Sequence, residues 1–414
     1  MNSQEMAQQP AQPPQTGQHR GRRPALDAPP SGSLPASSVL PRDRRQGSAT
    51  MRRAVSLTLV VPAILTASAG VFPGQDWQAA TPDAQGVNAA RLDEAMDHIQ
   101  ANSGGPGAAE SVVVRHGHLI WRGPRADAQH SSWSCSKSFA STVLGLLIED
   151  DRCTLDTKAT EFLPRLAERY PPYADITLRH FVTMTSGYDG VGGGYADRNM
   201  DGSSTWFEPA PPLFAPGSAF SYWDDAQSLF GQVLTLAAGE ELSRYFKRRI
   251  GDPIGMTNWL WGTHRTADGV PVANAASGVN LSASDLARFG VLYLNRGVWN
   301  GRKLLNASWV EQATRVQVPA RLPHGGYRAD TDGRGVYGFN WWVNGLKPDG
   351  TRPWPSAPPR TFLARGFNNN VCFVVPEWDL VLVRMAETDD IGKQFDTFWN
   401  TVFAKLAPGI DSSR

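Results

Sequence analysis

The chain of 414 residues is 41% hydrophobic, which is enough to build a large buried core. Its formal net charge at neutral pH is +1, but the charge is unevenly placed. Taking the eight Arg and three acidic residues of positions 1–69 from the totals of 40 and 39 leaves 32 basic and 36 acidic residues in the rest of the chain. This mildly acidic remainder gives no reason to expect a nucleic acid as a partner.

The first 69 residues differ in character from the rest. Residues 1–50 are rich in Gln, Pro, Ser and Arg, so we expect a disordered extension, or a misassigned start with Met51 as the true one. Residues 51–69 combine two Arg, an apolar run and a small-residue ending, the pattern of a secretory signal peptide. A membrane-proximal anchor is the alternative, although the run is short for a membrane span. We predict an exported protein, periplasmic or secreted, with a single domain at 70–414 and no integral membrane segment after cleavage.

Regular secondary-structure patterns stand at both ends of this domain. Residues 87–102 have the spacing of an amphipathic helix, and residues 111–122 form two β-rich runs around a His-Gly turn. Residues 370–385 form a second pair of apolar runs, and apolar side chains from Phe395 to Leu406 have helical spacing. The long middle lacks such strand patterns. The sequence therefore predicts an α/β (α+β) fold, with an antiparallel sheet flanked by N- and C-terminal helices and a helical, loop-rich region between.

The stretch Ser134-Cys135-Ser136-Lys137 opens a strongly apolar helix between the terminal regions. Residues three apart share a helix face, so Lys137 can stand beside the Ser134 hydroxyl and take its proton. A lysine does this only if its pKa falls from about 10.4 towards about 7–8, which burial or a nearby cation can bring about. Chance spacing on a surface helix is the alternative. We predict Ser134 as the nucleophile and Lys137 as its base.

The three cysteines are not expected to form a disulfide between Cys135 and Cys153. The two stand at opposite ends of the predicted helix, roughly 27 Å apart, whereas a disulfide needs about 7 Å or less. Cys372 lies in an apolar run, where a free buried thiol is expected.

A calcium-loop pattern follows in the middle region. The run from Asp197 to Gly202 places oxygen side chains at alternate positions, with Glu208 six residues beyond the glycine. Asp197, Asn199, Asp201 and Glu208 match the ligands of a hard cation such as Ca²⁺, and a solvated acidic turn is the alternative. No other cofactor is expected to be needed.

A second catalytic candidate, Tyr222, precedes a predicted helix at Ala226–Ala238. A tyrosine at this point can hydrogen-bond the Ser134–Lys137 pair and shuttle its proton. The alternative is a packed aromatic residue whose hydroxyl binds the backbone. Tyr293 lies inside a predicted helix that begins near Ser282, and we interpret it as structural.

Taken in order, these motifs resemble the serine-hydrolase family of class C β-lactamases, D-alanyl-D-alanine carboxypeptidases, certain esterases and nylon-oligomer hydrolases. The resemblance covers roughly Val87 to Ala407 and rests on the Ser-x-x-Lys stretch and four further segments: Phe181–Tyr188, Pro216–Asp224, Pro253–Met256 and Ser282–Gly297. It implies the two-part β-lactamase-like fold, with Ser134 acylated, Lys137 as base and Tyr222 as second base and proton shuttle. It also implies an oxyanion hole made by the N–H of Ser134 and one from the strand near Gly366-Phe367.

Two departures from the family pattern bear on the substrate, a small acyl compound. The family's Tyr-x-Asn is here Tyr222-x-Asp224, and a carboxylate beside Lys137 raises that lysine's pKa unless Asp224 is turned away or protonated. The family's Lys-or-His-x-Gly motif aligns with Ala364-Arg365-Gly366, which removes a cation. Arg365 need not replace it, because neighbouring side chains on a strand face opposite ways.

Without that cation, which holds the substrate carboxylate in β-lactamases and carboxypeptidases, an ester or amide substrate of lower charge is favoured. β-Lactamase or D-alanyl-D-alanine carboxypeptidase activity is the first alternative. A non-catalytic binding protein on the same fold is the second. His324-Gly325-Gly326 also matches the letters of the third motif, but it lies in a polar stretch, and we interpret it as unrelated.

Overall fold

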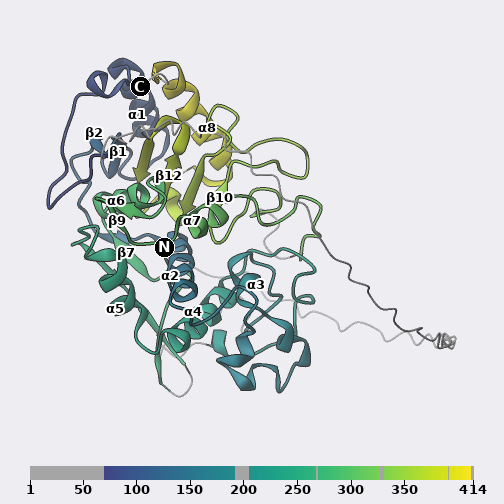
Figure 1. Ribbon diagram of the computed structural model, residues 1–414. Coiled ribbons are helices and arrows are strands. Elements are labelled where there is room, and N and C mark those ends of the chain that lie inside the picture. The colour runs from purple at the N-terminus through teal and green to yellow at the C-terminus, as the bar shows by residue number, and fades with distance from the viewer. Residues whose placement is uncertain (1–69, 192–204, 267–268, 327–330, 390, 412–414) are drawn as a thin grey trace, which may run out of the picture. The chain divides into compact units, whose positions relative to one another are not determined.

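The computed structural model describes residues 70–191, 205–266, 269–326, 331–389 and 391–411 (Figure 1). The predictions for residues 1–69, and the candidate calcium ligands Asp197, Asn199 and Asp201, therefore lie outside the described residues. None of the described helices is long and apolar enough to cross a membrane.

A six-stranded antiparallel sheet is built from both ends of the domain, as predicted. Its strand order is β10-β11-β12-β13-β1-β2, so the first hairpin joins the last strands of the chain. Strand β1 pairs with β13 in the register Ser111 to Arg384 and Arg115 to Leu380. The strands are β1 (Ser111–Arg115), β2 (His118–Arg122), β10 (Trp342–Val343), β11 (Phe362–Arg365), β12 (Val371–Val375) and β13 (Leu380–Arg384).

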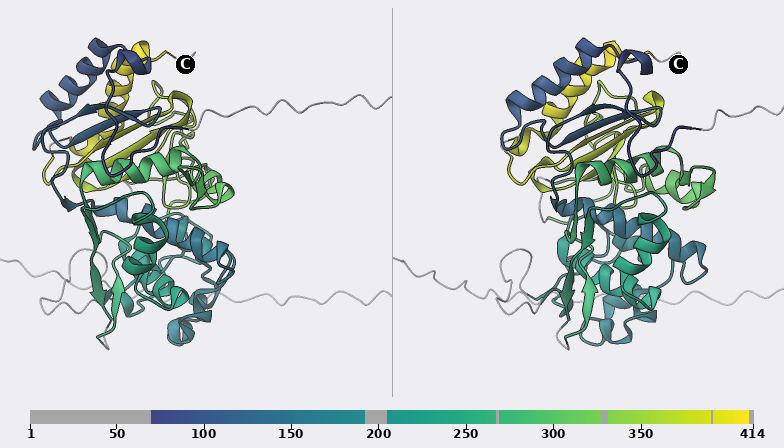
Figure 2. Two further views of the ribbon diagram at one scale, coloured as in Figure 1. Left: turned by 60° about the vertical axis from the view of Figure 1, so that its left-hand side comes forward. Right: turned by 90° about the vertical axis from the view of Figure 1, so that its left-hand side faces the viewer.

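Helices cover both faces of this sheet (Figure 2). Helix α1 (Ala89–Asn102) packs beside α8 (Phe395–Leu406) on one face, as the apolar spacing predicted. Helix α6 (Ala283–Leu294) covers the other face, against β1, β12 and β13, and Ser282 caps its N-terminus by accepting from Asp285 N. Because strand side chains alternate, the sheet contributes to two cores, one beneath α1 and α8 and one continuous with α6 and the helical region.

The helical region lies on the α6 side of the sheet. It contains the nucleophile helix α2 (Ser136–Glu149), which packs against α4 and is buried along nearly its whole length. The other helices are α3 (Leu178–Val182), α4 (Asp224–Ala238), α5 (Leu242–Phe246) and α7 (Ala307–Ala313). Helix α4 begins two residues earlier than the sequence predicted, so that Asp224 is its first residue.

The middle of the chain also holds short strands that the sequence pattern did not reveal. They are two or three residues long, too short for side-chain alternation to be recognised. One three-stranded sheet has the order β3-β7-β4, and β5 pairs with β6 and β8 with β9. Their bounds are β3 (His130–Ser131), β4 (Trp259–Trp261), β5 (Thr263–Arg265), β6 (Pro271–Ala273), β7 (Val279–Leu281), β8 (Val298–Trp299) and β9 (Arg302–Lys303).

The three cysteines are all free and buried. Burial raises the pKa of the Cys135 thiol, whose Sγ donates to the carbonyl of Asn370 at 3.4 Å. Cys135 thus acts as a packed side chain between the start of α2 and the sheet, and its thiol is held in the neutral form.

Candidate active site

Ser134 lies in a tight turn between strand β3 and helix α2. Trp133, just before it, has φ of +51°, a left-handed conformation that costs energy for a non-glycine residue. The turn is held because Ser136 Oγ donates to the Trp133 carbonyl at 2.6 Å and accepts from Val279 N at 2.8 Å. Ser132 Oγ donates to the Val279 carbonyl at 2.8 Å. The short sheet around β7 therefore fixes the backbone that presents Ser134.

Lys137 is brought beside the Ser134 hydroxyl, as the spacing predicted. Its Nζ lies 2.9 Å from Ser134 Oγ, 2.7 Å from Asp224 Oδ1 and 2.8 Å from the carbonyl oxygen of Ala276. The lysine is only 1% exposed, which excludes a solvent-facing residue with chance spacing. Three close oxygens match the three hydrogens of an ammonium group.

The same three contacts also fit a neutral lysine. A neutral amine has two N–H donors, enough for Asp224 and Ala276, and its lone pair can accept the Ser134 hydroxyl proton. The two states differ by one proton, which the ammonium must lose before Nζ can accept the Ser134 proton. The geometry is therefore that of a base ready to receive the proton of the nucleophile.

Asp224 faces Lys137 rather than turning away from it. Its side chain is 15% exposed, and it stands at the first residue of α4, where the helix N-terminus favours a carboxylate. Both the helix end and the lysine lie where they favour the anionic form of this carboxyl group. Asp224 is thus not turned away, and its expected opposition to a neutral lysine stays a prediction.

Tyr222 packs against this pair. Its ring centroid is 4.9 Å from Lys137 Nζ, and the ring stacks on Trp342 at 5.7 Å between centroids. The backbone N–H of Ser221 donates to the Met184 carbonyl at 3.0 Å and holds this segment in place. The Tyr222 hydroxyl makes no hydrogen bond to any residue that the structure describes. The predicted hydrogen bond from Tyr222 to the Ser134–Lys137 pair is therefore not formed, since the ring rather than the hydroxyl contacts Lys137. The hydroxyl is available to a bound molecule, and its role as a proton shuttle stays a prediction.

Two backbone N–H groups near the Ser134 turn have no acceptor among the described residues. Gly366 N donates to the Asn370 carbonyl at 2.7 Å, so this N–H is already used. The N–H groups of Ser134 and Phe367, by contrast, donate to no other group in the described ranges. A side chain at position 366 is excluded, since a Cβ would lie 2.1 Å from the Ser132 carbonyl oxygen. This close approach places the Phe367 N–H beside the Ser134 turn, and Trp133 and Phe367 touch edge to face at 5.6 Å.

The loop that carries Phe367 is held by residues that the sequence analysis did not single out. Asn368 and Asn369 both have left-handed φ, and their carbonyls accept from the guanidinium of Arg384 at 3.1 and 3.3 Å. Asn370 Nδ2 donates to the Phe367 carbonyl at 2.7 Å. The three consecutive Asn at 368–370 could have indicated this loop in the sequence, because Asn adopts the left-handed backbone conformation more readily than most residues.

Arg384 itself is fully buried, and it pairs with Asp389 at 2.9 Å. Its Nε also donates to the Gly107 carbonyl at 3.1 Å. The position of Arg384 at the end of an otherwise apolar strand could also have indicated this loop, because a buried arginine requires hydrogen-bond or ion-pair partners nearby. We call Arg384, Asp389 and the loop Phe367–Asn370 the loop clamp.

Ala364 and Arg365 point to opposite faces of β11, as the strand alternation predicted. Ala364 is fully buried in the core that includes Cys135 and Cys372. The Arg365 guanidinium lies over the Phe395 ring at 3.6 Å and over the Trp342 ring at 5.3 Å. Arg365 is therefore one aromatic ring removed from Tyr222, and it does not occupy the place of the family's cation.

The remaining predicted ligand, Glu208, has its side chain 60% exposed and 3.9 Å from Arg169. Its three proposed companions lie outside the described residues, so the calcium loop stays a prediction. Within the described ranges, no three His, Cys, Asp or Glu side chains stand close enough to hold a metal.

The His324 loop lies closer to the site than its polar sequence indicated. His324 forms a parallel bridge with Phe220, and Gly325 N donates to the Phe220 carbonyl at 2.7 Å. This loop therefore holds Phe220, two residues before Tyr222.

Comparisons with known proteins show the family and the fold of the chain. A family model described as Beta-lactamase matches residues 92–400. The chain is 25% identical over 256 residues to the 6-aminohexanoate-dimer hydrolase of Paenarthrobacter ureafaciens, covering 53% of this chain and 64% of that protein.

Solved structures show the same fold. EstCE1, a hydrolase with promiscuous acyltransferase activity, superposes with a TM-score of 0.58 at 20% identity, over 78% of this chain and 99% of that one. A penicillin-binding protein homologue from Caulobacter crescentus gives a TM-score of 0.58 at 15% identity, over 80% and 98%. At 20% and 15% identity, these superpositions show a shared fold and do not assign an activity to the chain.

Proposed function

The chain belongs to the beta-lactamase family of hydrolases, and we propose that it cleaves ester or amide bonds through an acyl-enzyme on Ser134. The observation that carries this proposal is the 2.9 Å contact between Ser134 Oγ and the buried Lys137 Nζ, next to two N–H groups without internal acceptors. A nucleophile, its base and an oxyanion site are the parts that acyl transfer needs.

In the proposed reaction, neutral Lys137 accepts the Ser134 proton as Oγ bonds to the acyl carbon. The carbonyl oxygen gains negative charge and accepts hydrogen bonds from the N–H groups of Ser134 and Phe367. The bond to the leaving group then breaks, and the leaving alcohol or amine receives, through the Tyr222 hydroxyl, the proton that Lys137 took from Ser134. A water molecule attacks the acyl-enzyme by the reverse sequence, which returns the proton to Ser134.

The substrate preference follows from the charges around the nucleophile. The cation that the family uses to hold a substrate carboxylate is replaced by Ala364, which is fully buried. Arg365 is stacked on Phe395 and Trp342. An uncharged ester or amide therefore suits the site better than a β-lactam or a D-alanyl-D-alanine peptide, whose carboxylates need a cation. The Paenarthrobacter relative is also named for an amide, but the 6-aminohexanoate dimer carries a terminal carboxylate, so that name supports amide cleavage and does not bear on substrate charge.

Labelling with a fluorophosphonate probe tests the nucleophile. We expect a covalent adduct on the peptide that contains Ser134, no adduct in Ser134→Ala, and an unchanged adduct in Ser218→Ala. Ser218 is the control because its hydroxyl is exposed and bonds only locally, to the Ala215 carbonyl at 2.6 Å. A folded protein without a Ser134 adduct would refute the proposal and favour a binding protein on this fold.

A substrate panel then separates the activities that share this mechanism. We expect p-nitrophenyl esters and uncharged p-nitroanilides to be cleaved faster than nitrocefin, which carries a carboxylate. Faster cleavage of nitrocefin, again lost in Ser134→Ala, would assign the chain to β-lactam chemistry instead.

A further inference from the structure

A large hollow lies apart from the catalytic residues. Its volume is about 1040 Å³, within the scale of ligand sites, and none of the catalytic candidates lines it. It is bounded by the end of α6, by α7 and by strands β10 and β11. Four arginines line this hollow, which we call the arginine groove: Arg296, Arg315, Arg352 and Arg360.

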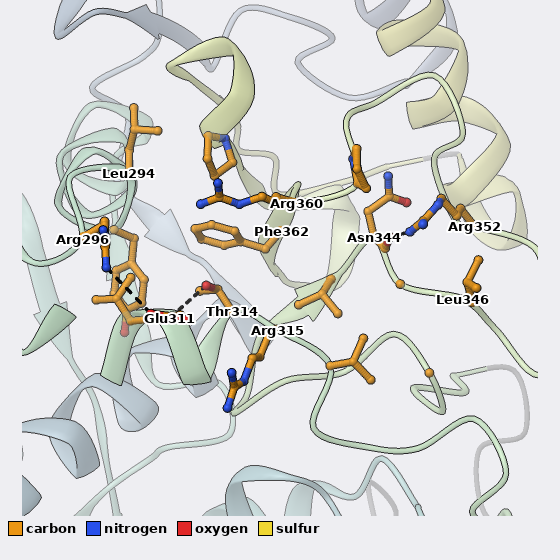
Figure 3. A pocket seen from close by; sticks show the side chains of 18 of the residues that line it. Leu294, Arg296, Glu311, Thr314, Arg315, Asn344, Leu346, Arg352, Arg360 and Phe362 are labelled. Carbon is orange, nitrogen blue, oxygen red and sulfur yellow. Dashed lines mark hydrogen bonds and ion pairs between the residues drawn. The ribbon is translucent and has the colours of Figure 1, made fainter. Parts of the chain in front are cut away.

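Figure 3 shows these arginines around a shared space, with Phe362 at its centre and Glu311 near Arg296. Glu311 lies 3.8 Å from Arg296, and both side chains are more than 60% exposed, so this ion pair is weak. The guanidinium of Arg352 donates to the Asn344 carbonyl, which leaves its charge without a counterion there.

Arg315 and Arg360 have guanidinium groups without a hydrogen bond or ion pair to any residue that the structure describes. Both side chains are exposed on loops, where water solvates the guanidinium, so the lack of a protein partner does not lower the stability of the fold. Four arginines and one glutamate among the lining residues leave a formal charge of +3. A concave surface concentrates such a field and attracts anions.

The lining also offers apolar contact. Phe362 and Val343 are buried beneath the groove, while Val316 and Leu346 are 43% and 50% exposed on its wall. Guanidinium groups bind phosphate and carboxylate oxygens in pairs, with a geometry that an ammonium lacks. The groove thus combines anion recognition with a surface for the carbon skeleton of an organic ligand.

We propose that the arginine groove binds a soluble organic anion with two or more phosphate or carboxylate groups. A soluble ligand is favoured over a membrane surface because the cations surround a hollow rather than project from a flat or convex face. Glu311, standing among them, would repel a continuous layer of anionic headgroups. The groove is separate from Ser134, so this binding does not require the proposed hydrolysis.

Calorimetric titration with tripolyphosphate and with citrate tests the proposal on the full chain. We expect at least one of them to bind, and the dissociation constant to rise about tenfold or more in the double variant Arg315→Ala/Arg360→Ala. Arg244→Ala is the matched control, because that arginine is 77% exposed on α5 and outside the groove. Its dissociation constant should equal that of the unaltered protein.

Three results would overturn the proposal. One is the absence of heat with both anions at low ionic strength. Another is equal weakening by Arg244→Ala, which would mean a general attraction to the surface charge. The third is arginine-dependent binding of phosphatidylglycerol vesicles without binding of either soluble anion, which would assign the groove to a membrane surface. The fluorophosphonate adduct at Ser134 should be unchanged in the double variant, so failure here is distinguishable from failure of the proposed hydrolysis.

Discussion

The two halves of the proposed catalytic centre are built in different ways. The base half consists of side chains that contact one another, with Lys137 bonded to both Ser134 and Asp224. The acceptor half consists of backbone N–H groups, held in place by the loop clamp around Arg384. A base must change its protonation state, whereas an oxyanion site must keep its donors fixed. The difference in construction follows from these two tasks.

Each half nevertheless depends on a buried cation paired with a carboxylate. Lys137 pairs with Asp224 in the base half, and Arg384 pairs with Asp389 in the acceptor half. A lysine can lose its proton when its surroundings change, but an arginine remains charged in proteins. The comparison therefore predicts that changes in the base half affect protonation, while changes in the acceptor half affect geometry.

The largest effect is expected for Lys137→Met. Loss of the base should lower the rate of acylation by about 10³–10⁴-fold, in line with the upper range of general base catalysis. It should also reduce the free energy of unfolding by about 3–5 kcal/mol, because the largely buried Asp224 carboxylate loses its ion pair with Lys137. Burst-phase ester hydrolysis and urea unfolding measure the two quantities.

The double variant Lys137→Met/Asp224→Asn separates these contributions. With the unpaired charge removed, stability should return while the acylation rate stays low. If the double variant regains activity, Lys137 is a structural partner of Asp224 and not the base.

A smaller effect on rate is expected for Arg384→Lys. The shorter ammonium keeps the charge but cannot reach both the Asn368 and Asn369 carbonyls together with Asp389. The loop that presents the Phe367 N–H should loosen, and kcat should fall by about 10–100-fold with little change in KM, less than for loss of an oxyanion donor. Steady-state kinetics with a neutral ester measure the change in kcat and the change in KM separately.

Arg115→Lys provides a matched control at the other end of the same strand pair. Arg115 is equally buried, and it donates to the Gly86 and Asp411 carbonyls at 2.7 and 2.6 Å, far from the oxyanion loop. Both variants should lose similar stability, about 1–3 kcal/mol, but only Arg384→Lys should lose activity. Equal kcat losses in the two would mean that the loop clamp has no special role.

How far the sequence predicted the site differs between the same two halves. Ser134 and Lys137 are three residues apart, in the turn before α2 and in its first turn, so their contact follows from local geometry. The terminal helices and the hairpin at 111–122 were likewise predicted from periodicity, and the structure confirms them. Such features depend on residues that are close in the chain.

The acceptor half depends on residues that are distant in the chain. The Phe367 N–H becomes available only because Gly366 approaches Ser132 and because Arg384 reaches the loop from another strand. A backbone N–H carries no residue-type signal, so its role could be inferred only from the family resemblance. The orientation of Asp224 was also open, because it depends on where α4 begins relative to α2.

The smallest effect is expected for Asp224→Asn, which keeps the shape of the base half but removes its negative charge. The carboxylate stabilises the Lys137 ammonium, so its removal lowers the pKa of Lys137. Because catalysis needs the neutral amine, the acid limb of the kcat/KM profile should move to lower pH by about one unit, and activity on that limb should rise about tenfold. Asp175→Asn removes the same charge from an exposed surface position and should leave the profile unchanged. An acid limb that stays in place while activity falls would instead make Asp224 a member of the base that accepts the Ser134 proton. In that case the base half, like the acceptor half, would depend on the placement of a carboxylate and not only on the protonation of Lys137.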